Sequence, residues 1–138
     1  MVLIWGLNKM IKYTRVDNSV FAYFDDGNYN QYAYDYWAGN LLGYFNKHSP
    51  DIVSWKVADI VHDIVNECAE SGMKFYGEAK CHPDDEYSCT LGEYIAKHRL
   101  LDKYLTVRSR IARRLAKDVS KTYYRLGKIA KTDRKKDW

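Results

Sequence analysis

The sequence predicts an α+β fold with three parts. These are a small antiparallel sheet, a packed amphipathic helix and a long basic C-terminal helix. Three observations support this prediction. Short runs of strand-forming residues end at turn signals, one stretch repeats apolar residues at three- and four-residue steps, and the last third of the chain lacks proline. The length of 138 residues, with 46% hydrophobic residues, suits a single domain with a packed core.

Three segments are expected to form the sheet. Residues 19–24 (SVFAYF) are rich in strand formers and are followed by an Asp-Asp-Gly turn signal. Residues 10–16 are expected to pair with them as a hairpin across the Asp-Asn pair that separates the two segments. Residues 74–81 (KFYGEAKC) are predicted to form the third strand, with Gly77 marking a bulge or a close approach of another backbone.

Two helices are expected before the third strand. Residues 29–47 place aromatic and leucine side chains at helical spacing, although two glycines weaken the pattern. Ser49-Pro50-Asp51 has the features of a helix start, namely a capping serine, a proline at the first helical position and an acid near the positive helix end. Apolar residues then recur at helical steps, which predicts a helix over 51–71 closed by Gly72.

The C-terminal helix is expected to begin at a capping box, Thr90-Leu91-Gly92-Glu93, and to run for roughly 30 residues or more because no proline follows. A packing seam is predicted at alternating steps of four and three residues, interrupted by the polar residues His98, Arg108 and Thr122. The seam consists of Tyr94, His98, Leu101, Leu105, Arg108, Ala112, Leu115, Val119, Thr122, Leu126 and Ile129. Lys and Arg residues recur two positions after the seam residues. Two positions correspond to about 200° of rotation around the helix, so we expect this cationic stripe to lie on the side of the helix opposite to the packing seam. With Arg113 beside it, this predicted nucleic-acid-binding stripe consists of Arg99, Lys103, Arg110, Arg114, Lys117, Lys121, Arg125 and Lys128.

Charge is divided unevenly along the chain. Residues 97–138 carry 15 Lys and Arg against four Asp, whereas residues 1–96 carry seven Lys and Arg against 14 Asp and Glu. We therefore expect an acidic α+β core (1–96), a basic helical extension of the same domain (97–131) and a frayed tail (132–138). Such asymmetry is typical of a basic arm that binds nucleic acid or another acidic surface. The alternative is that the basic segment folds back and neutralises the acidic part.

The chain is rich in aromatic residues, with 13 Tyr and four Trp. A cluster of them is formed by Tyr29, Tyr32, Tyr34, Tyr36 and Trp37. These rings either pack on the core or offer stacking faces and polar tips to a partner.

Residues 81–86 (CHPDDE) resemble the A-H-P-D-D-E motif of the LmbE/PIG-L zinc-dependent deacetylases. The resemblance implies that His82 and Asp85 bind zinc and that Asp84 is the base for the metal-bound water. It covers six residues, and the only later histidine that could supply the family's third ligand is His98. We interpret the match as coincidental and expect no enzymatic activity, no cofactor and no metal site. A site formed by Cys81, His82 and Cys89 stays an open alternative.

A second resemblance covers about 30 residues. It is carried by Gly77, Ala79, Cys81, Pro83 and Asp85 at alternating positions, followed by Gly92 and Ala96. This pattern is similar to a strand–turn–helix signature of small phage and prophage proteins of uncharacterised function. The resemblance implies a phage origin.

The sequence favours a binding protein over an enzyme. No segment has the length of a membrane span or the features of a signal peptide, and three cysteines suit a reducing cytosol. We hypothesise a phage-encoded protein of the host cytoplasm whose C-terminal helix contacts nucleic acid or a nucleic-acid-bound complex. One alternative is an inhibitor of a host defence nuclease, such as an anti-CRISPR factor, that binds through the aromatic cluster. The other is a zinc-dependent hydrolase relic. A homodimer could form through Leu101, Leu105, Leu115 and Val119.

Overall fold

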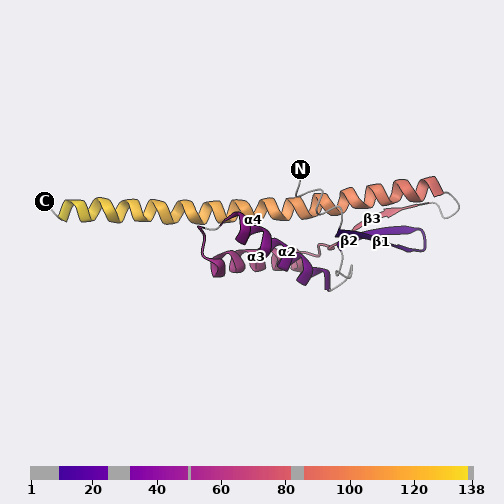
Figure 1. Cartoon of the computed structure of the whole chain (residues 1–138), viewed down its shortest axis with the longest axis horizontal. Helices are drawn as coiled ribbons and strands as arrows, with labels where there is room; N and C mark the ends of the chain where they lie inside the picture. The colour runs from indigo at the N-terminus through magenta and orange to yellow at the C-terminus, as the bar shows by residue number, and fades with distance from the viewer. Residues whose placement is uncertain (1–9, 25–31, 50, 82–85, 137–138) are drawn as a thin grey trace.

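Figure 1 shows a computed structural model of the chain, which describes residues 10–24, 32–49, 51–81 and 86–136. For residues 32–35, 86–89, 123 and 132–136 it describes the backbone alone. The described elements follow in the order β1 (Ile11–Val16), β2 (Ser19–Phe24), α2 (Tyr32–His48), α3 (Ser54–Glu70), β3 (Gly77–Lys80) and α4 (Glu86–Lys136). This arrangement confirms the predicted α+β fold.

The sheet is antiparallel, with β2 between β1 and β3. The expected hairpin is confirmed, because Val16 pairs with Ser19 across a two-residue turn. Asp17 in this turn adopts a φ of 53°, a left-handed conformation that aspartate tolerates better than most residues. The third strand begins at Gly77 and is shorter than predicted.

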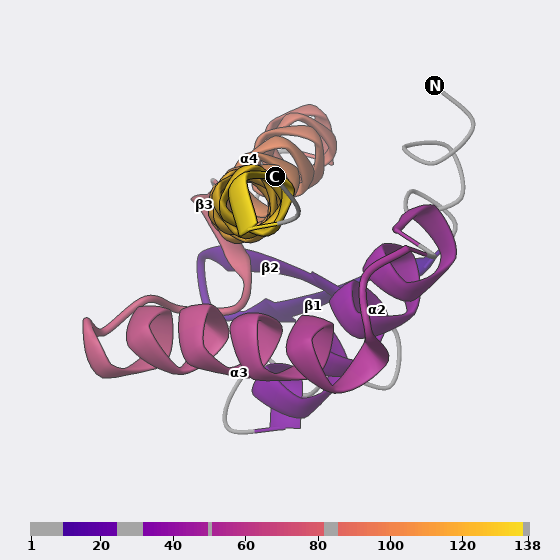
Figure 2. The same cartoon turned by 90° about the vertical axis from the view of Figure 1, so that its left-hand side faces the viewer.

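Helix α4 lies along one face of the sheet (Figures 1 and 2). That face presents Val20, Ala22 and Phe24 of β2, which are all buried. The helix backbone approaches closest at Gly77, where an added Cβ would collide with the carbonyl oxygen of Ala96 and lie 2.6 Å from the amide nitrogen of Leu100. Gly77 therefore marks a close approach, one of the two roles predicted for it.

Helices α2 and α3 pack against each other, and α3 also contacts α4 further along the chain (Figure 2). Aromatic rings fill the junction between the sheet, α2 and α4. The ring centroid of Tyr104 lies 5.1 Å from that of Phe24 and 5.3 Å from that of Trp37, and Trp37 lies 5.1 Å from Phe75. One continuous core therefore joins the sheet to all three described helices.

The predicted start of α3 is wrong. The Ser49 amide donates to the Phe45 carbonyl at 2.8 Å, so Ser49 still belongs to the end of α2. The Ile52 amide then donates to the Ser49 carbonyl at 3.1 Å, which makes a turn, and α3 begins at Ser54 after an N-cap residue, Val53, that makes no side-chain capping bond. Pro50 lies outside the described residues. The predicted end is confirmed, because Gly72 follows the C-cap with a φ of 89°.

The start and the packed face of α4 also differ from the prediction. The helix begins at Glu86, so the Thr90–Glu93 capping box lies inside it, and it continues without a break to Lys136. Its buried residues are Ala96, Leu100, Leu101, Tyr104, Val107, Ile111 and Leu115. Of the predicted seam, Leu101 and Leu115 are buried, whereas Tyr94, Leu126 and Ile129 are more than half exposed. The core therefore continues well past residue 96 into the segment assigned to a basic extension.

Candidate nucleic-acid interface

The cationic stripe of α4 borders the packed face of the helix and does not lie opposite to it. Arg99, Lys103 and Arg110 each precede a buried residue by one position, a rotation of only about 100°. These three side chains can therefore reach the rest of the molecule. The prediction that they face away from the packing is wrong.

Arg99 and Lys103 bind backbone carbonyls at the edge of the sheet. Arg99 Nη1 donates to the Glu78 carbonyl at 2.6 Å, and Lys103 Nζ donates to the carbonyls of Tyr76 at 2.7 Å and Lys74 at 3.3 Å. Burial lowers the pKa of the Lys103 ammonium below its ordinary value, a shift that Glu78 opposes and Arg99 reinforces. Charged groups that occupy a strand edge discourage further strand pairing, so this role is structural.

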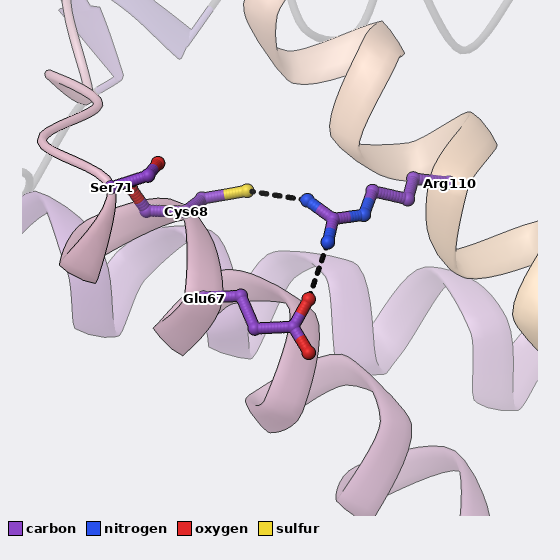
Figure 3. A network of polar contacts seen from close by, with 4 residues as sticks. All are labelled: Glu67, Cys68, Ser71 and Arg110. Carbon is purple, nitrogen blue, oxygen red and sulfur yellow. Dashed lines mark hydrogen bonds and ion pairs between the residues drawn. The ribbon is translucent and has the colours of Figure 1, made fainter.

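Arg110 connects α4 to the last turn of α3 (Figure 3). Its Nη2 pairs with Glu67 Oε2, and its Nη1 lies 3.7 Å from Cys68 Sγ. Ser71 Oγ donates to the Cys68 carbonyl at 2.8 Å, which fastens the end of α3. Arg110 is thus committed to a contact within the molecule, and its predicted role in nucleic-acid binding is not supported by its position.

The other predicted cations are exposed. Arg113 and Arg114 lie beside the buried Leu115, and the later cations follow along the part of α4 that extends beyond the rest of the fold (Figure 1). Lys131 continues their spacing and was missed by the sequence analysis, although it follows Lys128 at a helical step. We call residues 117–136 the arm. The cationic face comprises Arg113, Arg114, Lys117, Lys121, Arg125, Lys128 and Lys131.

Little acidic charge accompanies the cationic face. Between residues 113 and 131 the sequence contains one acid, Asp118, whose Oδ2 lies 3.8 Å from Lys56 Nζ of α3. Tyr124 is 68% exposed on the arm, and Lys128 Nζ lies 4.8 Å from its ring centroid. The arm therefore offers positive charge and an aromatic ring on the same side.

The aromatic cluster is largely a packing feature at its described end. Trp37 is fully buried, so its predicted role in partner binding is wrong. Tyr36 is half-buried, stacks on Phe24 at 5.9 Å and donates its hydroxyl to Met10 Sδ at 3.0 Å. The predicted partner-binding residue Tyr29 and the side chains of Tyr32 and Tyr34 lie outside the described residues.

The proposed dimer seam is used within the molecule. Leu101 and Leu115 are buried in the core, and Leu105 and Val119 are half-buried, so these four residues do not form an exposed seam. The structure therefore does not support a homodimer through them.

The metal predictions lie mostly beyond the described residues. His82, Asp84 and Asp85 fall in the segment 82–85, and the side chain of Cys89 is also outside the description. Among the described side chains, no group of three or more His, Cys, Asp or Glu is placed to hold a metal ion. Cys81 is buried and is not part of a disulfide.

Comparison with protein-family models, with curated proteins and with solved structures finds no match for this chain. No helix within the described ranges combines the length and the apolar character needed to span a bilayer.

Proposed function

We propose that the protein binds nucleic acid, without enzymatic activity, through the cationic face of α4. The observation that carries this proposal is the run of seven cations from Arg113 to Lys131 on an exposed helix, with one acid that is already ion-paired. Lys and Arg side chains in such a row neutralise successive phosphates and release condensed counterions.

The binding is expected to discriminate weakly between sequences. Asn and Gln, which pair with adenine edges, are absent from residues 97–138. Arg113, Arg114 and Arg125 can contact phosphates or guanine edges, and Tyr124 offers an exposed ring on which an unpaired base can stack. The ligand class is therefore the polyanionic backbone, either free or within a nucleoprotein complex.

Fluorescence anisotropy with labelled duplex and single-stranded DNA and RNA tests the proposal. If about six phosphates are contacted, the affinity should fall about 10³-fold between 50 and 200 mM salt. Absence of binding at the lower salt concentration would contradict the proposal.

A charge-reversed pair locates the interface. Arg114→Glu with Lys117→Glu should lower the affinity at 50 mM salt at least about tenfold and reduce the salt slope by about two. The matched control, Arg15→Glu with Lys47→Glu, makes the same change in net charge at exposed positions of β1 and α2. An equal loss in both double variants would show that net charge, and not the face of α4, determines the affinity.

A further inference from the structure

Helix α3 carries an acidic stripe on the side that faces away from the core. Asp59, Asp63, Glu67 and Glu70 are exposed and follow one another at steps of four, four and three residues. Residues at such steps line one face of a helix. Trp55, one step before Asp59, extends the same face and is 64% exposed.

The arm carries a basic stripe with the same spacing. Lys117, Lys121, Arg125 and Lys128 are exposed and also follow at steps of four, four and three residues. Each stripe covers about 16 Å of helix. Tyr124, which lies between Lys121 and Arg125, adds an exposed ring to the basic stripe, and Trp55 adds one just before the acidic stripe. The two faces therefore carry opposite charges at the same spacing, and Asp59, Asp63 and Glu70 stay available to a partner while Glu67 pairs with Arg110 of its own chain.

The arm cannot reach the acidic stripe of its own chain. Glu67 near the end of α3 pairs with Arg110, whereas Lys56 near its start pairs with Asp118, so α4 runs antiparallel to α3. The arm therefore leaves α3 at its first turn and continues away from the rest of that helix (Figure 1). The acidic stripe can meet a basic stripe of this kind only on another molecule.

We propose that the arm of one copy docks on the acidic stripe of α3 in a second copy. Charge complementarity between the two faces favours this occupant, and each copy supplies one arm and one α3. A closed pair with twofold symmetry would use both contacts. Exposed ion pairs alone contribute little, so burial of Trp55 and Tyr124 adds to the contact.

This contact uses arm side chains that the proposed function assigns to phosphates, but it does not depend on nucleic-acid binding. If both hold, the acidic stripe and a nucleic acid compete for the same cations. Adding DNA should then separate the two copies.

A charge-swap experiment tests the contact. One variant carries Lys117→Glu and Lys121→Glu on the arm, and the other carries Asp59→Lys and Asp63→Lys on α3, at exposed positions that leave Glu67 paired with Arg110. Sedimentation velocity over a range of concentrations, at 50 and 200 mM salt, gives the dissociation constant of the pair. We expect the wild type to associate, and each variant alone to weaken association at least about tenfold.

The decisive sample is an equimolar mixture of the two variants. In the twofold pair the arm lies parallel to α3 of the other copy, because α4 runs antiparallel to α3 within each copy. Positions 117 and 121 then face positions 59 and 63, so in the mixture both contacts regain opposite charges and association should return toward the wild-type value. A wild type that stays monomeric at low salt would overturn the proposal, and so would a mixture that fails to associate or association that survives both reversals. The α3 variant should keep its nucleic-acid affinity, so failure of docking and failure of the proposed function give different results.

Discussion

Tyr104 is the residue at which the sheet, α2 and α4 meet. Its ring contacts Phe24 and Trp37, and its hydroxyl donates to Asn40 Oδ1. It is 1% exposed, and burial raises the pKa of its phenol well above the ordinary value, with Arg108 opposing the shift. The folded state therefore holds the phenol in its protonated form.

This burial predicts a specific loss of stability at alkaline pH. Below the ordinary tyrosine pKa of 10.0, both states are protonated and the stabilising contribution is complete. Above it the unfolded state ionises while the folded state keeps its proton, so the free energy of unfolding falls by about 1.4 kcal/mol per pH unit. Urea denaturation at several pH values should show a shallower fall for Tyr104→Phe. Equal slopes in the two proteins would contradict this assignment.

Gly77 is the second residue whose environment makes a clear prediction. The Cβ of alanine at this position would meet the backbone of α4, which cannot move without disturbing the core. Gly77→Ala should therefore lower the free energy of unfolding by about 3 kcal/mol. Gly39→Ala is the matched control, because nothing lies within 4 Å of its added Cβ, and should stabilise α2 by about 0.5–1 kcal/mol. Thermal unfolding of both variants measures the difference.

At the scale of elements, the sequence predicted the hairpin and the helices but not the packed side of α4. The strands of the hairpin were predictable because their apolar runs are bounded by turn residues. The packed side of α4 was not predictable, because apolar residues occur around much of the circumference of this helix. Ala96 and Leu100 are buried because Gly77 allows the helix close to the sheet there, and this contact cannot be read from the sequence of α4 alone.

The difference between the predicted and the observed packed side of α4 also explains why three of the predicted site residues contact the rest of the chain. The sequence predicted the cations of the arm, but it could not show that Arg99, Lys103 and Arg110 bind the rest of the chain. Their partners are three backbone carbonyls in and just before β3 and a glutamate of α3, which are distant in sequence. Only the tertiary arrangement separates structural cations from exposed ones.

The buried face of α4 ends near Leu115, so two leucines of this helix should differ sharply in their contribution to stability. Leu115 is 3% exposed and Leu126 is 53% exposed. Leu115→Ala should lower the free energy of unfolding by about 2–5 kcal/mol, whereas Leu126→Ala should change it by less than about 0.5 kcal/mol. Chemical denaturation of the two variants tests this contrast. A large loss for Leu126→Ala in dilute protein would place the arm against the rest of its own chain.

At the scale of the whole molecule, opposite charges are separated in space. The acidic residues lie mainly in the part that holds the sheet, α2 and α3, and the basic arm extends from one side of it (Figure 1). The alternative in which the basic segment folds back and neutralises the acidic part applies to Arg110 but not to the arm. The molecule thus presents two surfaces of opposite sign.

Helix α4 has no break between the core and the arm. The direction in which each arm side chain points is therefore determined by the number of residues that separate it from the packed part of the helix. One alanine inserted after Thr122 would turn Arg125 and Lys128 by about 100° away from Lys117 and Lys121, whereas seven inserted residues would nearly restore their direction. We expect the single insertion to reduce the salt slope of nucleic-acid binding and the seven-residue insertion to preserve it. The length of this stretch is therefore constrained in multiples of the helical repeat, even though its individual side chains can vary.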